Sequence, residues 1–274
     1  MNITRHHLDR ECAGHVLVDK TSGKFAQGLP DTIVIHYTAG STMESAVDTL
    51  KDPDVRASAH VVVDKDGSMT QMVPFDHVAW HAGQSAYKDR NGMNRFSIGI
   101  EMVNAGRLDK SGHVWRSWFG RIYPEEEVVR ARHRNENEPT YWERYTPEQI
   151  DAVIQLCKSL KKTYQIQHIL GHEEISPGRK IDPGPAFPLD KLRDTLLHGD
   201  RSDVDEPKAG EPARGMVQAS ALNIRTGPSV NAHTIADPLS RNTEVEIVDE
   251  KEGWLQVKVK ITGWVAAEFV ERLP

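Results

Sequence analysis

The sequence is poor in cysteine, with only Cys12 and Cys157 among its 274 residues. Small secreted domains that depend on disulfides carry many more cysteines in a short chain. Cys157 falls in an apolar pattern with helical spacing, which favours a buried thiol. We therefore expect no disulfide framework, and a fold held together by a hydrophobic core, for which 38% hydrophobic residues suffice.

Dense positive charge is absent as well. No run of five or more Lys or Arg residues occurs, and the formal net charge of the chain is -6. A protein that binds nucleic acid through its phosphate backbone needs a basic surface. We therefore expect no nucleic-acid partner.

Long apolar stretches are missing too. No window approaches the roughly 18 apolar residues that cross a bilayer, and residues 1–11 lack the apolar core of a secretory signal peptide. The sequence predicts no membrane span and synthesis in the cytoplasm without a standard signal. A substrate outside the membrane would then be reached after lysis or by a non-standard export route.

Residues 199–214 differ in composition from the rest of the chain. They contain eight charged residues, two prolines and a single branched apolar residue. Such a segment buries too little apolar surface to fold. We predict a linker here, between a domain of residues 1–198 and a smaller domain of residues 215–274.

Strands alternate with helices before this linker. The predicted strands are 31–37, 59–64, 96–103 and 167–170, and the predicted helices are 41–51 and 146–160. The second helix begins with Thr146-Pro147-Glu148-Gln149, a capping box with proline at the first helical position. This alternation predicts an α/β domain whose mixed β-sheet is flanked by helices.

The predicted strand at 96–103 contains one acidic residue, Glu101. Its alternation places Ile98, Ile100 and Met102 on one face and Glu101 on the other. Glu101 is therefore predicted to point away from the apolar core.

The pattern changes after the linker. Short strands are predicted at 244–248, 254–259 and 263–265, separated by charged or glycine-containing turns. Strands of this length and spacing are typical of a small all-β barrel of about 55 to 60 residues.

Three potential metal ligands lie near the ends of predicted strands. His36 closes the first strand, and His172 and Asp182 lie in the segment that follows the strand at 167–170. Two histidines and one carboxylate leave the fourth position of a tetrahedral zinc ion open, which hydrolysis requires. The alternative is that His172 and Asp182 only hold a loop.

The tripeptide His172-Glu173-Glu174 invites comparison with zinc metalloproteases. Their helical motif needs a second histidine four residues after the first. That position holds Ser176, so this interpretation is excluded.

Five short motifs occur in order along the first domain. They are Ile35-His36-Tyr37-Thr38, Ser58-Ala59-His60-Val61, Ala79-Trp80-His81-Ala82-Gly83, Ser97-Ile98-Gly99-Ile100-Glu101, and Gly171-His172 continued by Arg179-Lys180-Ile181-Asp182-Pro183-Gly184. Together, from about residue 30 to 195, they resemble the N-acetylmuramoyl-L-alanine amidase family. This family includes peptidoglycan-recycling amidases, phage lysins and animal peptidoglycan recognition proteins.

The resemblance implies zinc-dependent hydrolysis of the amide bond between N-acetylmuramic acid and L-alanine in peptidoglycan, by attack of a zinc-bound water. It implies that His36, His172 and Asp182 bind zinc, with Asp182 as the third ligand as in the recycling amidases. It also implies that Glu101 assists the attacking water and that Lys180 stabilises the oxyanion, roles that suit a carboxylate and a cation. The alternatives are an ion-paired Glu101 and a surface Lys180.

The motifs also suggest substrate-binding residues. Trp80 and His81 suit a wall for the sugar and stem peptide, and Asn104 follows the Glu101 strand; a structural role is the alternative for each. His60 is predicted to pack in the fold or line the cleft and not to bind the metal, because a fourth protein ligand would close the site. The charged, aromatic segment 106–142 is predicted to contact the glycan in part, or else to be a packed excursion.

The C-terminal region has a resemblance of its own. Residues 221–229, 253–257 and 263–265 resemble a bacterial SH3-type domain, for which peptidoglycan binding is the family expectation. Such a module would raise the local concentration of the enzyme at the wall.

Two other functions remain open. A recognition protein would hold muropeptide without cutting it, although its usual mark, a lost ligand, is not found. A glycosidase would need two carboxylates about 5 to 10 Å apart across a sugar, and no pair stands out.

Overall fold

The computed structural model describes residues 1–197, 213–217, 221–229, 232–240, 243–251 and 254–259. The chain divides into two units, residues 1–200 and residues 201–274. Within the described ranges, no helix is both long enough and apolar enough to cross a membrane.

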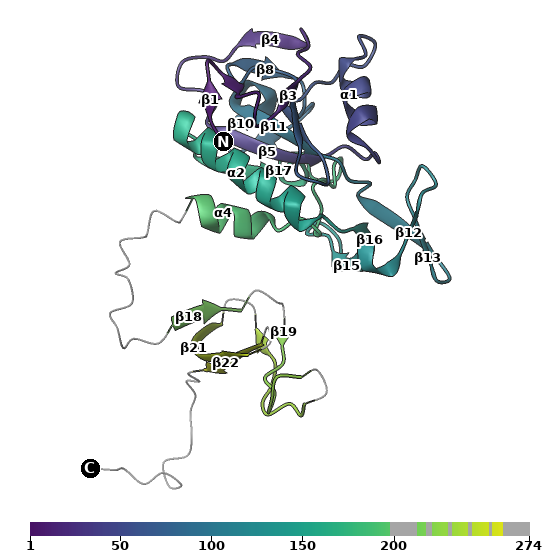
Figure 1. The fold of residues 1–274 in the computed structure, drawn as a ribbon, viewed down its shortest axis with the longest axis vertical. Coiled ribbons are helices and arrows are strands. Elements are labelled where there is room, and N and C mark those ends of the chain that lie inside the picture. The colour runs from purple at the N-terminus through teal and green to yellow at the C-terminus, as the bar shows by residue number, and fades with distance from the viewer. Residues whose placement is uncertain (198–212, 218–220, 230–231, 241–242, 252–253, 260–274) are drawn as a thin grey trace, which may run out of the picture. The chain divides into compact units, whose positions relative to one another are not determined.

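A six-stranded sheet lies at the centre of the first unit (Figure 1). In sheet order its strands are β17 (His168–Gly171), β5 (Thr32–Tyr37), β11 (Ser97–Met102), β6 (Val61–Val63), β7 (Met69–Gln71) and β3 (Gly14–His15). The strands from β17 to β6 pair in parallel, whereas β7 runs antiparallel to β6 and β3 parallel to β7. The predicted mixed sheet is confirmed.

Helices cover both faces of this sheet. On one face, α2 (Pro147–Thr163) and α4 (Leu189–Leu197) join the apolar side chains of β5 and β11 in the largest core cluster. On the other face, α1 (Met43–Lys51) packs through Ala46 and Leu50 against Val62. The predicted α/β class is therefore confirmed.

Short elements complete the first unit. They are the strand pairs β1 (Ile3–Thr4) with β2 (His7–Leu8), β4 (Thr21–Lys24) with β8 (His77–Ala79), and β9 (Ala86–Tyr87) with β10 (Arg90–Asn91), the 3-10 helix η1 (Met93–Phe96), and the single-turn helix α3 (His172–Ile175).

The start of α2 follows the predicted cap only in part. The side chain of Thr146 accepts a hydrogen bond from the backbone N–H of Gln149, as expected of an N-cap. The Gln149 side chain, however, donates to the carbonyl oxygens of Val63 and Val103. It therefore attaches the helix to the sheet.

Strand β11 alternates as predicted. Ile98, Ile100 and Met102 enter the core that α2 covers. The other face carries Gly99, where an added Cβ would lie 2.3 Å from Cγ of His81, so only glycine leaves room for that ring. Glu101 lies on the same face as Gly99.

Residues 107–143 form a second sheet that the sequence pattern did not predict (Figure 1). Its strands are β14 (Ile122–Tyr123), β13 (Val114–Arg116), β12 (Arg107–Ser111), β16 (Pro139–Glu143) and β15 (Val128–Arg132) in sheet order, and the 3-10 helix η2 (Glu125–Glu127) precedes β15. All its pairs are antiparallel. Leu108, Tyr123 and Val128 form its own small core with Ala105. We call residues 107–143 the inserted sheet.

The second unit is all β in its described residues. A three-stranded antiparallel sheet joins β18 (Ala213–Met216), β21 (Glu244–Lys251) and β22 (Trp254–Lys258), and β19 (Ala221–Leu222) pairs with β20 (Leu239–Ser240). The predicted strand at 263–265 lies outside the described residues. So does most of the predicted linker, although β18 already begins at Ala213, before the predicted end of the linker.

Candidate active site

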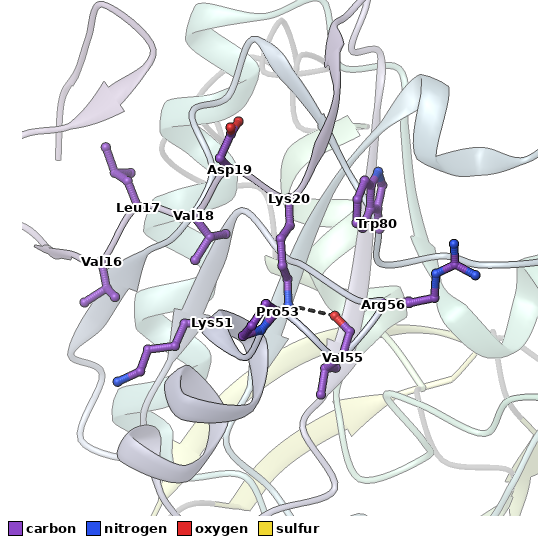
Figure 2. Close-up of a pocket in the computed structure, with 10 residues that line it drawn as sticks. All are labelled: Val16, Leu17, Val18, Asp19, Lys20, Lys51, Pro53, Val55, Arg56 and Trp80. Carbon is purple, nitrogen blue, oxygen red and sulfur yellow. Dashed lines mark hydrogen bonds between the residues drawn. The ribbon is translucent and has the colours of Figure 1, made fainter.

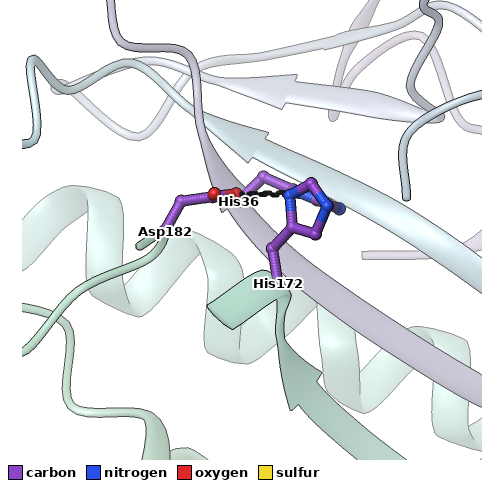
Figure 3. A group of neighbouring side chains, drawn as sticks. All are labelled: His36, His172 and Asp182. Atoms are coloured by element: carbon purple, nitrogen blue, oxygen red, sulfur yellow. Dashed lines mark hydrogen bonds and ion pairs between the residues drawn. The ribbon is translucent and has the colours of Figure 1, made fainter. Parts of the chain in front are cut away.

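The three predicted metal ligands converge at one edge of the central sheet (Figure 3). His36 lies near the carboxyl end of β5, and His172 follows the neighbouring parallel strand β17, so the two strands deliver both rings to the same edge. Asp182 comes from the loop after α3. Nδ1 of His36 lies 2.9 Å from Nδ1 of His172, and Oδ2 of Asp182 lies 3.0 Å and 2.9 Å from these two nitrogens.

His81 determines which nitrogen of His36 carries the proton. Nε2 of His81 lies 3.1 Å from the carbonyl oxygen of Ser97, which can only accept, so this nitrogen carries hydrogen. Burial holds the pKa of His81 well below its usual value, so the ring is neutral and its Nδ1 accepts. Nε2 of His36, 2.9 Å away, therefore donates to His81.

His172 is oriented in the same manner. Its Nε2 lies 3.0 Å from the carbonyl oxygen of Ala82, so this nitrogen also carries hydrogen. Burial and the neighbouring His172 lower the pKa of His36 to about 4, so His36 is neutral. Nδ1 of each ring lies toward the other ring and toward Asp182.

Nδ1 of His36, Nδ1 of His172 and Oδ2 of Asp182 are all atoms that can bind a metal ion. Burial alone would raise the pKa of the Asp182 carboxyl, but its contacts with His172 and His36 hold that pKa below its usual value, so it is a carboxylate. Ligands of a tetrahedral zinc ion lie about 3.3 Å apart, given metal–ligand distances of about 2.0 Å. The observed spacing and the ligand types fit a small divalent cation.

Glu101 stands beside this group. It is paired in register with His36 across β11 and β5. Its Oε2 is buried and has no hydrogen-bond partner among the described residues. Burial, with a smaller contribution from Asp182, raises the pKa of Glu101 to about 8, and Lys180 opposes this rise. A buried carboxyl group whose pKa lies near neutral and that has an unused oxygen is suited to proton transfer.

Lys180 acts electrostatically on the same atoms. Its positive charge lowers the pKa of both His36 and Glu101. That Lys180 lies beside the metal group stays a prediction.

Comparison with known proteins identifies the first unit. A model of the N-acetylmuramoyl-L-alanine amidase family matches residues 22–185, more than half of the chain. The chain belongs to this family. A model of the bacterial SH3 domain matches residues 220–271 of the second unit.

Curated relatives agree with this assignment to the amidase family. The N-acetylmuramoyl-L-alanine amidase AmiD of Escherichia coli K12 is 31% identical over 191 residues, which cover 66% of this chain and 59% of AmiD. The 1,6-anhydro-N-acetylmuramyl-L-alanine amidase AmpD of the same strain is 32% identical over 141 residues, 51% of this chain and 58% of AmpD. The chain thus spans just under three fifths of the length of these two relatives.

A solved structure supports the amidase fold. The crystal structure of a selenomethionine derivative of AmpD superposes with a TM-score of 0.53 at 25% identity, covering 72% of this chain and 99% of the AmpD chain. The matched family region contains the two histidines, Asp182, Glu101 and Lys180.

Within the amidase domain, the predicted substrate-binding residues lie in different settings. The indole of Trp80 is partly exposed and donates through Nε1 to the Ser22 hydroxyl. It lines a cavity of about 700 Å³ together with Lys20 and Arg56 (Figure 2). His36, His172 and Asp182 do not line this cavity. A substrate contact by Trp80 stays a prediction.

The side chains of His81 and Asn104 are buried and bonded to protein groups. Both ring nitrogens of His81 are engaged, with His36 and with Ser97. Asn104 accepts from the N–H of Gly106 and donates weakly to the carbonyl of Glu143. The geometry thus favours supporting roles for both, and their predicted contact with substrate stays a prediction.

His60 lies outside the metal group. Its Nδ1 accepts from the backbone N–H of Gly99, and its Nε2 donates to the carbonyl of His77. The ring is fully buried and packs in the fold, as predicted.

The sequence analysis did not identify the residues that hold the segment between His172 and Asp182, which we call the ligand loop. The buried carboxylate of Glu173 accepts from His133, Arg134 and the N–H of Gly184, so it ties the loop between the ligands to the inserted sheet. Arg179 donates to the carbonyl of Ala82, the same oxygen that fixes His172. No local pattern signals the contacts of Glu173 with His133 or of Arg179 with Ala82, because these residues lie 40 and 97 positions apart in sequence.

Proposed function

We propose that this protein hydrolyses the amide bond between N-acetylmuramic acid and L-alanine in peptidoglycan, with zinc as its cofactor. The observation that carries the proposal is the convergence of three potential metal ligands, Nδ1 of His36, Nδ1 of His172 and Oδ2 of Asp182, within 3.0 Å of one another. Membership of the amidase family supplies the substrate class.

His36, His172 and Asp182 would hold the zinc ion. Imidazole and carboxylate are ligands that zinc prefers, and three protein ligands leave a position open for catalysis. When bound, zinc supplies a Lewis acid that polarises the scissile carbonyl and lowers the pKa of water. The hydrogen bonds from His36 to His81 and from His172 to Ala82 hold both rings in the required tautomer before the ion arrives.

Glu101 is proposed as the general base and then the general acid. Its unpartnered Oε2 would accept a proton from the attacking water and later return it to the amine nitrogen of L-alanine, which must be protonated to leave. The position of Glu101, directly across from His36, supports this role.

Lys180 is proposed to stabilise the tetrahedral oxyanion. Its effect on the pKa of both His36 and Glu101 supports a cation close to the place where negative charge develops. Before substrate binds, the same charge favours the ionised form of Glu101 that a base requires.

The second unit is proposed to bind peptidoglycan and thereby keep the amidase at the cell wall, where we propose that it acts. The bacterial SH3 match over residues 220–271 supports this assignment. Tethering raises the local concentration of enzyme without changing the chemistry.

Mass spectrometry of digested sacculi tests the proposed function. We expect fragments with a free amino terminus on L-alanine and intact glycan strands, and we expect no product when a chelator removes the metal. New reducing sugar ends would instead indicate a glycosidase. Binding of muropeptide without any product, in the zinc-loaded protein, would indicate a recognition protein.

A further inference from the structure

The large aromatic side chain of Trp118 is exposed to solvent. It is 74% exposed, the most exposed of the large hydrophobic residues in the described part of the chain. It occupies the turn that joins β13 to β14 in the inserted sheet. Indoles are enriched at interfaces where one end of the ring is apolar and the other is in water.

The turn that carries Trp118 is rigid. The backbone N–H of Gly120 donates to the carbonyl of Ser117, and the N–H of Ser117 donates to the carbonyl of Arg121. Gly120 has φ +92°, a conformation that glycine adopts without strain. The ring of Phe119 stands edge-on to the indole at 5.6 Å.

The indole is also anchored to the loop beside the metal group. Its Nε1 donates to the carbonyl oxygen of Ala39 at 2.8 Å. Ala39 follows His36 by three residues and has φ +53°, which is unusual for a residue with a Cβ and costs conformational energy. The bond therefore fixes the exposed ring a short way along the chain from a metal ligand.

Two further contacts attach the inserted sheet, which carries Trp118, to residues next to the active site. At one end, Oε2 of Glu143 accepts from the N–H of Ala105, just beyond β11. At the other end, His133 contacts Glu173, which adjoins His172. The ring is thus held in place relative to the site before any ligand binds, and preorganisation of this kind favours binding.

We propose that Trp118 is a platform on which a sugar ring of the peptidoglycan glycan strand stacks, beyond the muramic acid that carries the scissile amide. This inference rests on the proposed function, which places muramic acid at the metal group. A hexosamine ring has a face of C–H groups and a rim of polar groups, which matches an exposed indole face in a wet surface.

The charges nearby favour a sugar over the anionic stem peptide. Arg116 already donates to the carbonyl of Gly120, and Arg121 is paired with Glu127. The platform is therefore flat and apolar, and the two cations that flank it already have protein partners.

Binding of peptide-free glycan tests the platform apart from catalysis. The probe is a tetrasaccharide of alternating N-acetylglucosamine and N-acetylmuramic acid, titrated calorimetrically into the zinc-loaded full chain. Trp118→Ala should weaken binding about tenfold or more, as truncation of a buried anchor does. Trp118→Phe, which keeps a ring but loses the bond to Ala39, should fall in between. Ile122→Ala removes another exposed apolar side chain of the same hairpin, 55% exposed, and should bind as the parent does.

The SH3 unit could also bind the tetrasaccharide, so a second measurement follows catalysis instead of binding. For Trp118→Ala, the loss in kcat/KM should grow from muropeptides with one sugar to those with four. A loss that is the same at every glycan length, or that follows peptide length, would overturn the sugar assignment. Parent-like tetrasaccharide affinity in a Trp118→Ala variant with an unchanged Tm would overturn the platform. Trp118-dependent glycan binding without amide cleavage would support the platform and refute the proposed function.

Discussion

At the scale of single residues, the active site depends on where protons lie. Two carbonyl oxygens, of Ser97 and Ala82, determine the tautomers of His81 and His172, and His81 in turn determines that of His36. When the tautomer and the orientation of a histidine are already fixed, the ring does not have to rearrange when a metal ion binds. The carbonyls thus prepare a cation site without touching the cation.

His81 should therefore affect metal affinity. His81→Ala removes the acceptor for Nε2–H of His36, and we expect zinc affinity to fall about 10-fold to 100-fold, as is typical when such a partner is lost. Competition with a fluorescent chelator measures this. Trp80→Phe, a change at the adjacent residue whose ring does not contact His36, is the matched control. An unchanged zinc affinity in His81→Ala would refute the role.

Glu101 should separate chemistry from binding. Glu101→Gln keeps the size of the side chain but removes the basic carboxylate, so turnover should fall by about two orders of magnitude or more. Zinc content by elemental analysis and muropeptide affinity should stay at the level of the parent. Near-normal turnover would leave Glu101 a structural residue.

At the scale of elements, buried polar side chains join segments that are distant in sequence. Gln149 attaches α2 to β6 and to the residue after β11, and Glu173 attaches the ligand loop to the inserted sheet. His60 joins the N–H of Gly99 in β11 to the carbonyl of His77 in β8. Each such group has its hydrogen bonds only in the folded chain, so its loss costs stability.

His60 should make the stability of the first unit depend on pH. Burial lowers its pKa in the folded state to about 4, against an ordinary value near 6.5. The unfolded chain then binds more protons between these pH values, so stability rises with pH in that window and is lost as pH falls toward 4. The expected contribution is about 3 kcal/mol.

Urea unfolding of chelator-treated protein at pH 4.5 and pH 7 measures this contribution. The free energy of unfolding of the parent should fall more steeply on acidification than that of His60→Gln, whose amide does not titrate. The same slope in both proteins would contradict the assignment.

At the scale of the whole molecule, the chain combines an amidase domain with a bacterial SH3 domain. The two units divide near residue 200. Units with separate cores are expected to fold independently.

Truncation after Leu197 should leave a folded, zinc-loaded amidase domain. On small soluble muropeptides it should match the full chain, because tethering has no effect when the substrate is not a surface. On insoluble sacculi it should be slower, by up to roughly 100-fold. Rates of release of L-alanine amino termini from both substrates measure this. Equal rates on sacculi would mean that the SH3 unit binds something else, and an equal loss on both substrates would mean that it contributes to the active site.

The sequence by itself determined the local features of this protein. The periodicity of β11 predicted the core face of Ile98 and Ile100 and the opposite orientation of Glu101, because side chains alternate along any strand. The motifs around His36 and His172 predicted the family, and the residues in them are of the types that zinc prefers as ligands.

Only the tertiary structure decided how these residues support one another. The role of His81 depends on the carbonyl of Ser97, and the anchoring of Trp118 depends on the carbonyl of Ala39, 79 residues away in sequence. The inserted sheet was not predicted, because it is short-stranded and its apolar positions follow no single period. Backbone carbonyls are common to every residue, so which of them meets a given ring is decided only when the strands pair and pack.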